Sequence, residues 1–356
     1  MGGYSYSGIV ATRVLPSNEM ATEVVDSVEG LEWLANQWRE LWWADPSATP
    51  FQSPDWLIPW TRHLWGGGKL RVFTVRQYGR LTALAPFFLW GFGGRPQVLR
   101  LSFLGSGISD YLDMVCAPEC AAEATGAVLA RLTDGEAEWD VCDLQELRAC
   151  SPLLRCAGVK HNGCSVCPML PLRGSLREQL RGVDGTFRRS LRTAEKRLRE
   201  RGAVEFVRAD AGSCDRLLHR LFELHAGRWY ERGERGMFAT DRLRAFHRET
   251  AARFCAQGIL RLYGLMVDGQ PVAVQYNFAA KRRAYAYQAG FDVAWGRESP
   301  GAVLLAHSID DAIAEGAREF DFLRRPEPFK YAWGAVDAFT SRLVFGRGAE
   351  GCYTRV

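Results

Sequence analysis

The spacing of apolar residues predicts two helices near the start of the chain. Between residues 29 and 43, leucine and tryptophan recur every three or four positions, so they share one helical face. Ser53 is followed by Pro54, a pair typical of a helix start, and the pattern indicates a helix from there toward Leu64. Residues 1–22 show no such periodicity, and we expect them to be loosely ordered.

Apolar or alternating runs further along predict strands. Residues 70–75 and 81–89 are joined at Tyr78-Gly79, which is typical of a β-hairpin. Three more elements follow in the first half: a strand over 112–116, a helix over 119–132 and a strand over 139–144.

The second half of the chain repeats the first. Leu70-Arg71-Val72-Phe73 recurs 190 residues later as Leu260-Arg261-Leu262-Tyr263, and the glycine, alanine and phenylalanine that follow recur at the same offset. A second set of matches lies upstream at an offset of 187: Trp42, Phe51 and Ser53 recur as Trp229, Phe238 and Thr240. So long a period excludes a solenoid and predicts two copies of one domain plan.

The elements expected in the second half follow the same order. They are a helix over 217–229, a helix from Thr240 to Cys255, a hairpin of 260–267 and 272–278 turning at Asp268-Gly269, a strand over 284–290, a helix from Ser299 to Gly316 and a strand over 319–323. A meander followed by strand, helix and strand, twice over, predicts an α+β protein. Each domain should hold a mixed, mostly antiparallel sheet flanked by helices.

A strongly basic segment, residues 186–201, lies between the two halves. Its apolar residues share one helical face: Phe187, Leu191, Ala194 and Leu198. The rest of the segment carries basic side chains against only Glu195 and Glu200: Arg188, Arg189, Arg192, Lys196, Arg197, Arg199 and Arg201. Two interpretations stay open. The segment is a solvated helix packed by its apolar stripe, or it contacts a cofactor's phosphates, a nucleic acid backbone or an anionic membrane surface.

Size and composition fit this picture. A chain of 356 residues with 47% hydrophobic and 24% charged residues suits two globular domains, and its net charge of +4 is mild. It has no apolar run of about 18 residues, so we expect no membrane span. Residues 1–10 lack the pattern of a signal peptide. The expected location is the cytoplasm, with peripheral contact of residues 186–201 with the inner membrane face as the alternative.

The cysteines do not predict a metal site. Cys164 and Cys167 form the one tight pair, and Cys150 and Cys156 are too far apart to supply the matching second pair of a structural zinc site. We therefore expect reduced, mostly buried thiols and no metal.

Several short motifs between Thr186 and Gly334 point to a known family: Phe187-Arg188-Arg189-Ser190-Leu191, Leu224-His225 with Arg228-Trp229, Gly290-Phe291-Asp292, Ser299-Pro300-Gly301, Phe320-Asp321-Phe322-Leu323, Glu327-Pro328-Phe329-Lys330 and Trp333-Gly334. Together they resemble the GNAT superfamily of acyltransferases, and more closely its tandem-domain branch of FemAB-like and CelD-like proteins. The resemblance implies tandem duplicated GNAT-like domains: a degenerate N-terminal domain over 23–170 and a C-terminal domain over 171–356.

The resemblance also implies a donor site. Residues 297–302 stand where GNAT enzymes bind the pyrophosphate of acyl-CoA with an Arg/Gln-x-x-Gly-x-Gly/Ala pattern at a helix N-terminus. Pro300 replaces the first glycine, which removes one N–H donor. The residues expected to bind acyl-CoA, the implied co-substrate, are Arg297, Ser299, Gly301 and Ala302. The alternative is a capped helix that binds nothing.

Four residues are candidates for catalysis. Asp321 lies between Phe320 and Phe322 on an expected strand, so it should point to the opposite face. Glu327 and Lys330 follow on a loop that resembles a segment bordering a substrate channel in FemAB-like proteins. His225, with an ordinary pKa of about 6.5, would suit removal of a proton from an amine. The alternatives are a structural ion pair for Asp321 and Lys330, which could include Arg324, and a hydrogen-bonded wall position for His225.

Five further residues are expected to bind substrate: Trp229, Tyr276, Tyr287, Trp333 and Arg188. For the tyrosines the alternative is ordinary core packing.

These residues leave three hypotheses open. The first is an N-acyltransferase in which a primary amine, such as an amino sugar, a small amine or a lipid amine like a sphingoid base, attacks an acyl thioester directly with general-base help. The second is an aminoacyl-tRNA-dependent transferase of the FemAB type, with the basic segment on RNA phosphate. The third is a non-catalytic scaffold that binds a phosphorylated lipid or polymer.

Overall fold

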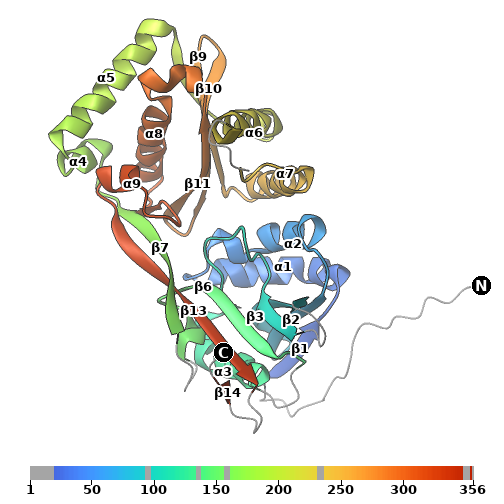
Figure 1. Cartoon of the computed structure of the whole chain (residues 1–356). Helices are drawn as coiled ribbons and strands as arrows, with labels where there is room; N and C mark the ends of the chain where they lie inside the picture. Colours follow the sequence, from blue (N-terminus) through green and yellow to red (C-terminus); the bar gives the residue numbers. More distant parts are fainter. Residues whose placement is uncertain are drawn as a thin grey trace, which may run out of the picture. The chain divides into compact units, whose positions relative to one another are not determined.

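The computed structural model describes residues 20–92, 98–133, 138–155, 161–230, 236–347 and 353–354. The chain divides into two compact units, Met1–Ser165 with Phe339–Val356, and Val166–Ala338 (Figure 1). It passes from one unit to the other twice, inside strand β7 (His161–Pro171) and inside strand β13 (Val336–Arg347).

The sheet of the first unit has the strand order β1-β2-β3-β4-β6-β13. Neighbouring strands are antiparallel except for β4 and β6, which are parallel. Its other strands are β1 (Ala21–Val25), β2 (Lys69–Gln77), β3 (Arg80–Phe92), β4 (Val98–Phe103), β5 (Val115–Cys116), β6 (Val141–Arg148) and β14 (Tyr353–Thr354). Its helices are α1 (Val28–Ala44), α2 (Pro54–His63) and α3 (Ala121–Leu132), with short 3-10 turns η1 (Pro50–Gln52), η2 (Pro118–Cys120) and η3 (Pro152–Arg155).

The sheet of the second unit has the order β8-β9-β10-β11-β12-β7, and here only β11 and β12 are parallel. Its strands besides β7 are β8 (Val204–Arg208), β9 (Leu260–Val267), β10 (Gln270–Ala280), β11 (Arg283–Phe291) and β12 (Glu319–Asp321). Its helices are α4 (Leu176–Arg181), α5 (Gly185–Arg201), α6 (Cys214–Tyr230), α7 (Asp241–Ala256), the 3-10 turn η4 (Val293–Glu298), α8 (Pro300–Ala314) and α9 (Pro328–Ala332).

The duplication expected from the sequence is confirmed, because both units run strand, two helices, three strands, helix and strand in the same pairing pattern, apart from the two-residue β5 that the first unit adds beside β3. The outermost strand is the exception to this order. β13 follows β12 in the chain yet pairs with β6, whereas β7 follows β6 in the chain yet pairs with β12. In the first unit the last strand of this order, β13, comes after the second copy in the chain. In the second unit the last strand, β7, comes after the first copy.

This exchange corrects the expected domain boundary. The sequence placed residues 339–356 in the second domain, but they belong to the first unit because residues 340–346 of β13 pair with β6. A second correction concerns the N-terminus. Ala21 already begins β1, which pairs with β2, so the loosely ordered segment expected over 1–22 is too long; residues 1–19 lie outside the described residues.

Local sequence signals account for the two hairpins. Tyr78 and Gly79 join β2 to β3 with φ of 51° and 76°, and Asp268 and Gly269 join β9 to β10 with φ of 48° and 74°. Two successive residues with positive φ match the right-handed twist of the flanking strands, and glycine adopts this conformation without strain.

In the second unit the helices cover both faces of the sheet. Helices α5 and α8 lie on one face, and α6 and α7 lie on the other (Figure 1). The stripe predicted for the basic segment packs as expected, since Leu191, Ala194 and Leu198 of α5 are buried against α8. At Gly290, a Cβ atom would lie 3.0 Å from the backbone nitrogen of His225, so only glycine lets α6 approach β11 this closely.

Candidate functional site

The N-terminus of α8 is capped by backbone groups. Ser299 adopts a left-handed conformation with φ of 47°, and its carbonyl accepts hydrogen bonds from the N–H groups of Ala302 and Val303. Among the described residues, the N–H of Gly301 has no hydrogen-bond partner. Arg297 and Ser299 are exposed beside it. A free amide at the positive end of a helix dipole suits an anion, and the residues predicted to bind the donor lie together on this one turn.

The basic helix α5 is attached to this turn. The Nη1 atom of Arg197 donates to the carbonyl of Arg297 at 3.1 Å. The guanidinium of Arg201 lies 3.6 Å from the ring centroid of Trp295 and 3.3 Å from a carboxylate oxygen of Glu298. These contacts bring the cationic face of α5 next to the helix terminus, where its field favours a polyanionic ligand.

Strands β11 and β12 separate at Tyr285, several residues before this turn. Their parallel pairing covers three residue pairs and ends at Tyr285 and Asp321. Beyond it the chain stays with β7, because the N–H of Phe322 donates to Pro168 and that of Arg325 to Val166, each at 3.0 Å. No strand within the described ranges pairs with β11 on this side past Tyr285. The backbone of residues 286–291 can therefore hydrogen-bond an extended, amide-bearing ligand.

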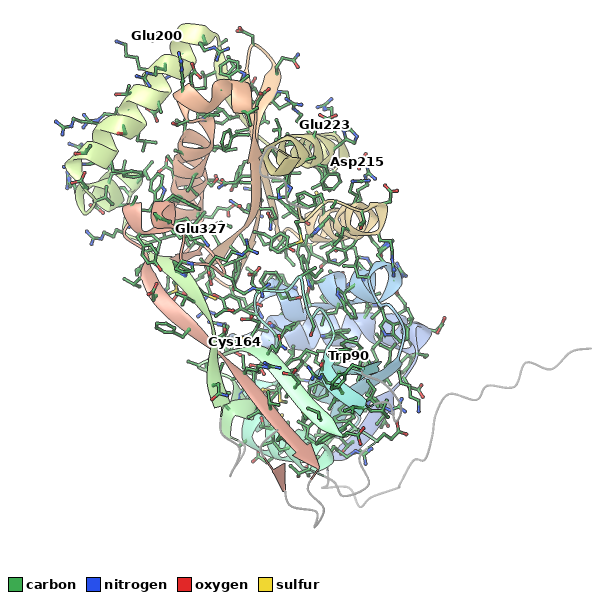
Figure 2. The ribbon with its side chains drawn as sticks, viewed as in Figure 1. Trp90, Cys164, Glu200, Asp215, Glu223 and Glu327 are labelled. Carbon is green, nitrogen blue, oxygen red and sulfur yellow. The ribbon has the colours of Figure 1, made fainter. Side chains whose placement is uncertain are left out.

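The loop after β12 is held by Lys330. The ammonium of Lys330 is 3% exposed and donates to the carbonyls of Leu323, Arg324 and Arg325 at 3.3, 2.7 and 2.8 Å. It also lies 2.9 Å from the carboxylate of Glu327, which is half-exposed at the start of α9 (Figure 2). The loop needs such support because Leu323 and Arg325 both have positive φ, of 58° and 82°.

Asp321 takes the orientation predicted from the sequence. Phe320 and Phe322 are buried in the core shared with α8, while Asp321 points to the opposite face, beside Tyr285 in register. Its Oδ1 atom accepts a hydrogen bond from the N–H of Leu323 at 2.8 Å, and the residue is 6% exposed. Lys330 pairs with Glu327, whose carboxylate lies 2.9 Å from its ammonium.

An aromatic cluster covers the sheet face under α6 and α7. The ring of Phe238 lies between those of His225 and His247, with centroid distances of 4.8 and 5.0 Å. His247 in turn contacts Tyr276 and Tyr287 at 5.8 and 5.7 Å. The cluster thus unites three of the predicted site residues, His225, Tyr276 and Tyr287.

The cluster also contains His247, which the sequence reasoning missed. His247 is fully buried, and burial lowers its pKa to about 3, with a further lowering by the neighbouring His225. Burial likewise raises the pKa of Tyr276 well above its usual value, and its hydroxyl has no partner in the part of the chain that the structure describes. The signal for His247 was its place on the apolar face of α7, beside Phe246 and three residues before Thr250.

Three predicted substrate-binding residues lie elsewhere. Trp333 is 1% exposed and packs edge-on against Phe187 at 5.0 Å, so it is a core residue on the face of α5 and α8. Arg188 is half-buried on α5, and within the described segments its Nε atom has no hydrogen-bond partner. Trp229 lies in α6, but its side chain is outside the described residues.

The described residues offer neither a clustered metal site nor a membrane-crossing helix. No group of three His, Cys, Asp or Glu side chains is placed to hold a metal ion there. None of the helices in those ranges is both long enough and apolar enough to cross a bilayer.

Comparisons with known proteins agree with the geometry of the second unit. Residues 185–331 match the family model described as an acetyltransferase (GNAT) domain. No curated protein matches the chain by sequence.

Solved structures resemble the chain in fold at low sequence identity. FemX is 12% identical with a TM-score of 0.64, and the match covers 87% of this chain and 95% of FemX. The C-terminal domain of a putative lysylphosphatidylglycerol synthetase from Agrobacterium fabrum is 13% identical with a TM-score of 0.56, covering 88% and 92%. A conserved protein of unknown function from Bacteroides thetaiotaomicron is 12% identical with a TM-score of 0.56, covering 89% and 96%. These likenesses concern the fold.

The buried His247 should make the protein less stable in mild acid. Because its folded pKa of about 3 lies below the unfolded value of about 6.5, only the unfolded chain gains a proton as the pH falls through this range. We expect this residue to cost about 2 kcal/mol of unfolding free energy between pH 6.5 and pH 5. Urea denaturation at both pH values measures the loss. His247→Phe should reduce it, while His219→Gln, at an exposed position on α6, should not. Equal pH dependence in all three proteins would contradict the prediction.

Removing the Lys330 ammonium should destabilise the protein. Lys330→Met leaves the buried carbonyl of Leu323 and the partly buried carbonyl of Arg324 without this donor, whereas the Arg325 carbonyl still accepts from the N–H of Glu327, so we expect a loss of about 3 kcal/mol in unfolding free energy. Glu327→Gln is the matched control: its carboxylate is half-exposed and screened, so the loss should stay below about 1 kcal/mol. Thermal or urea unfolding of both variants checks this, and similar losses for the two would show that the carbonyl contacts contribute little.

Proposed function

We propose that this chain, whose residues 185–331 match the acetyltransferase (GNAT) family model, moves an acyl group from acyl-CoA, or a similar thioester, to a primary amine. The observation that carries the proposal is the end of the β11–β12 pairing at Tyr285, after which residues 286–291 of β11 lead through a 3-10 turn to the free amide of Gly301 in α8. A strand edge that leads to an anion-binding helix end can contact both the amide-bearing and the phosphate-bearing part of such a donor.

The donor is proposed to lie along the exposed edge of β11. Its phosphates would contact the N–H of Gly301 and the turn formed by Arg297, Ser299 and Ala302. The cationic face of α5, which Arg197 and Arg201 attach to this turn, supplies the compensating charge. The pantetheine amides would then hydrogen-bond the backbone of residues 286–291, so that the thioester lies beside Asp321.

The reaction proposed is direct attack. The amine nitrogen bonds to the thioester carbonyl carbon, the C–S bond breaks, the amine proton passes to a base and the thiolate leaves. We propose Asp321 as that base because its carboxylate stands at the point where the strands separate. Glu327 is neutralised by Lys330, and His225 lies within the aromatic cluster, where it would form a wall of the acceptor site with Tyr276 and Tyr287. Lys330 then acts as a positioning residue for the loop.

The acceptor is proposed as a primary amine without a narrower class. An amino sugar, a small amine or a lipid amine such as a sphingoid base would each present the required nucleophile. The aromatic lining of the cluster near His225 would suit an apolar or cationic group on such an acceptor.

Incubation of the whole protein with a panel of acyl-CoA donors and amines tests the proposal. Release of free CoA thiol, with the acylated amine detected by mass spectrometry, is the expected result. Asp321→Asn keeps an acceptor for the N–H of Leu323 but removes the base, so kcat should fall by about 10²- to 10⁴-fold. Asp215→Asn, on the exposed surface of α6 (Figure 2), is the control and should leave kcat unchanged.

Three outcomes would count against the proposal. No CoA release with any donor, together with no protection by acyl-CoA against unfolding, would contradict the transferase reaction and favour the scaffold hypothesis. An unchanged kcat in Asp321→Asn would exclude Asp321 as the base. Activity that appears only with aminoacyl-tRNA would show that aminoacyl-tRNA, and not acyl-CoA, is the donor.

A second candidate, transfer from aminoacyl-tRNA, is favoured by the charge of α5. Most basic side chains outside its packed stripe are exposed: Arg189, Arg192, Lys196, Arg197, Arg199 and Arg201. If this face contacts RNA phosphates, tRNA affinity should fall steeply with salt, by about 10³-fold or more between 50 and 200 mM for several contacts. Filter binding measures this, with Arg192→Gln plus Arg199→Gln as the weakened variant. Absence of salt-dependent binding would eliminate this candidate, and binding of anionic vesicles instead would support the peripheral membrane alternative.

A further inference from the structure

The first unit contains a pocket of about 650 Å³ that no part of the proposed reaction uses. This volume falls within the range of small-molecule sites, roughly 300–1,000 Å³. The pocket lies where the end of β3, near Trp90 (Figure 2), meets the loop after α2 and the start of β4. Its walls come from apolar side chains: Trp60, Leu64, Phe88, Leu89, Trp90 and Leu99.

These walls favour an alkyl chain over a base or a sugar. The indole N–H of Trp90 is bonded to Ser102 at 3.2 Å, and the guanidinium of Arg100 lies 5.4 Å from its ring centroid. Phe88 lies edge-on to Trp60 at 5.4 Å. Because these aromatic rings already contact other side chains, they offer little free surface on which a base or sugar could stack. The polar edges of a nucleobase or sugar would also find few hydrogen-bonding groups here, which is costly for a buried ligand.

The remaining lining differs in character, because it is positively charged and polar. Gly66, Gly67 and Gly68 line the pocket next to Lys69. Gly67 and Gly68 have φ of 117° and 100°, a conformation that requires glycine. The N–H groups of these three glycines donate no hydrogen bond to any residue in the described ranges. Amides without a partner can donate to an anion.

Lys69 adds charge to the same place. Its side chain is 64% exposed, and its ammonium lies 3.9 Å from the carboxylate of Glu138. That carboxylate is held more closely by Arg71, whose Nε donates to it at 3.1 Å. Because Arg71 holds this carboxylate more closely, the Lys69 ammonium is only loosely paired and stays available to a ligand's anionic group.

We infer that the first unit binds an amphiphile, with a single alkyl or acyl chain in the pocket and a carboxylate or phosphate head group at the loop of Gly66 to Lys69. The first unit, expected from the sequence only to support the second, then has a binding role of its own. The inference does not use the transfer reaction, so each can fail without the other.

Calorimetric titration of the whole protein, below the critical micelle concentration of each ligand, tests the inference. Octanoate, decanoate and dodecanoate should bind with affinity rising roughly tenfold for each two methylenes, as burial of a chain requires. Dodecyl phosphate compared with dodecanoate shows which anionic head group fits better. Dodecyltrimethylammonium should bind at least tenfold more weakly than dodecanoate. Affinity independent of chain length, or uridine monophosphate binding as tightly as dodecanoate, would overturn the inference.

Variants then locate the site. Lys69→Gln should weaken dodecanoate about five- to tenfold and leave the neutral dodecanol unchanged. Leu64→Glu places a charge in the apolar wall and should weaken every chain more than tenfold. Arg80→Gln, an exposed cation at the opposite end of β3, is the control and should bind like the parent. If Leu64→Glu lowers the melting temperature strongly, the chain-length series on the unaltered protein still decides. Unchanged binding in both Lys69→Gln and a folded Leu64→Glu would place the ligand elsewhere and overturn the assignment.

Discussion

The candidate site depends on a competition between two neighbours for the segment that follows β12. After Asp321 this segment hydrogen-bonds to β7 and no longer to β11, and the parallel pairing ends after three residue pairs. The turn is made by the carboxylate of Asp321, which binds the N–H of Leu323, and by the ammonium of Lys330, which binds three carbonyls. The same contacts that open the sheet edge therefore place a carboxylate beside the opening.

Charge is distributed to match this opening. Helix α5 packs by its apolar stripe and at the same time contacts the turn before α8 through Arg197 and Arg201. The two interpretations of the basic segment are thus compatible, since one face is structural and the other stays available to an anion. The described residues of the first unit include no such basic helix. There Lys69 lines an apolar pocket, with Arg71 near it through the shared carboxylate of Glu138, and the ligand proposed for that unit differs accordingly.

Much of the fold was predictable because periodicity reports burial directly. The helices α1, α2, α6, α7 and α8 and both hairpins lie within a few residues of the predicted ranges. Strands β1, β4, β7, β8, β13 and β14 were missed, and the predicted strand over 112–116 shrinks to the two residues of β5. β8 is short and half-exposed at a sheet edge, so its sequence lacks the strong apolar alternation of a buried strand. Among the site residues, the sheet face toward which Asp321 points was predictable from strand alternation alone.

The sequence by itself determined the duplication, the turn chemistry, the α+β class and the chemical groups available, because these follow from local spacing and residue type. Only the tertiary structure decided which groups meet. In the folded chain Lys330 bonds to the carbonyls of its own loop, Trp333 packs in the core beside Phe187, and His247 joins the cluster around His225. Strand β7 pairs with β12 of the second copy, and strand β13 pairs with β6 of the first. Such outcomes depend on pairing between residues far apart in the chain, where many strands and side chains of similar character compete and only packing selects one.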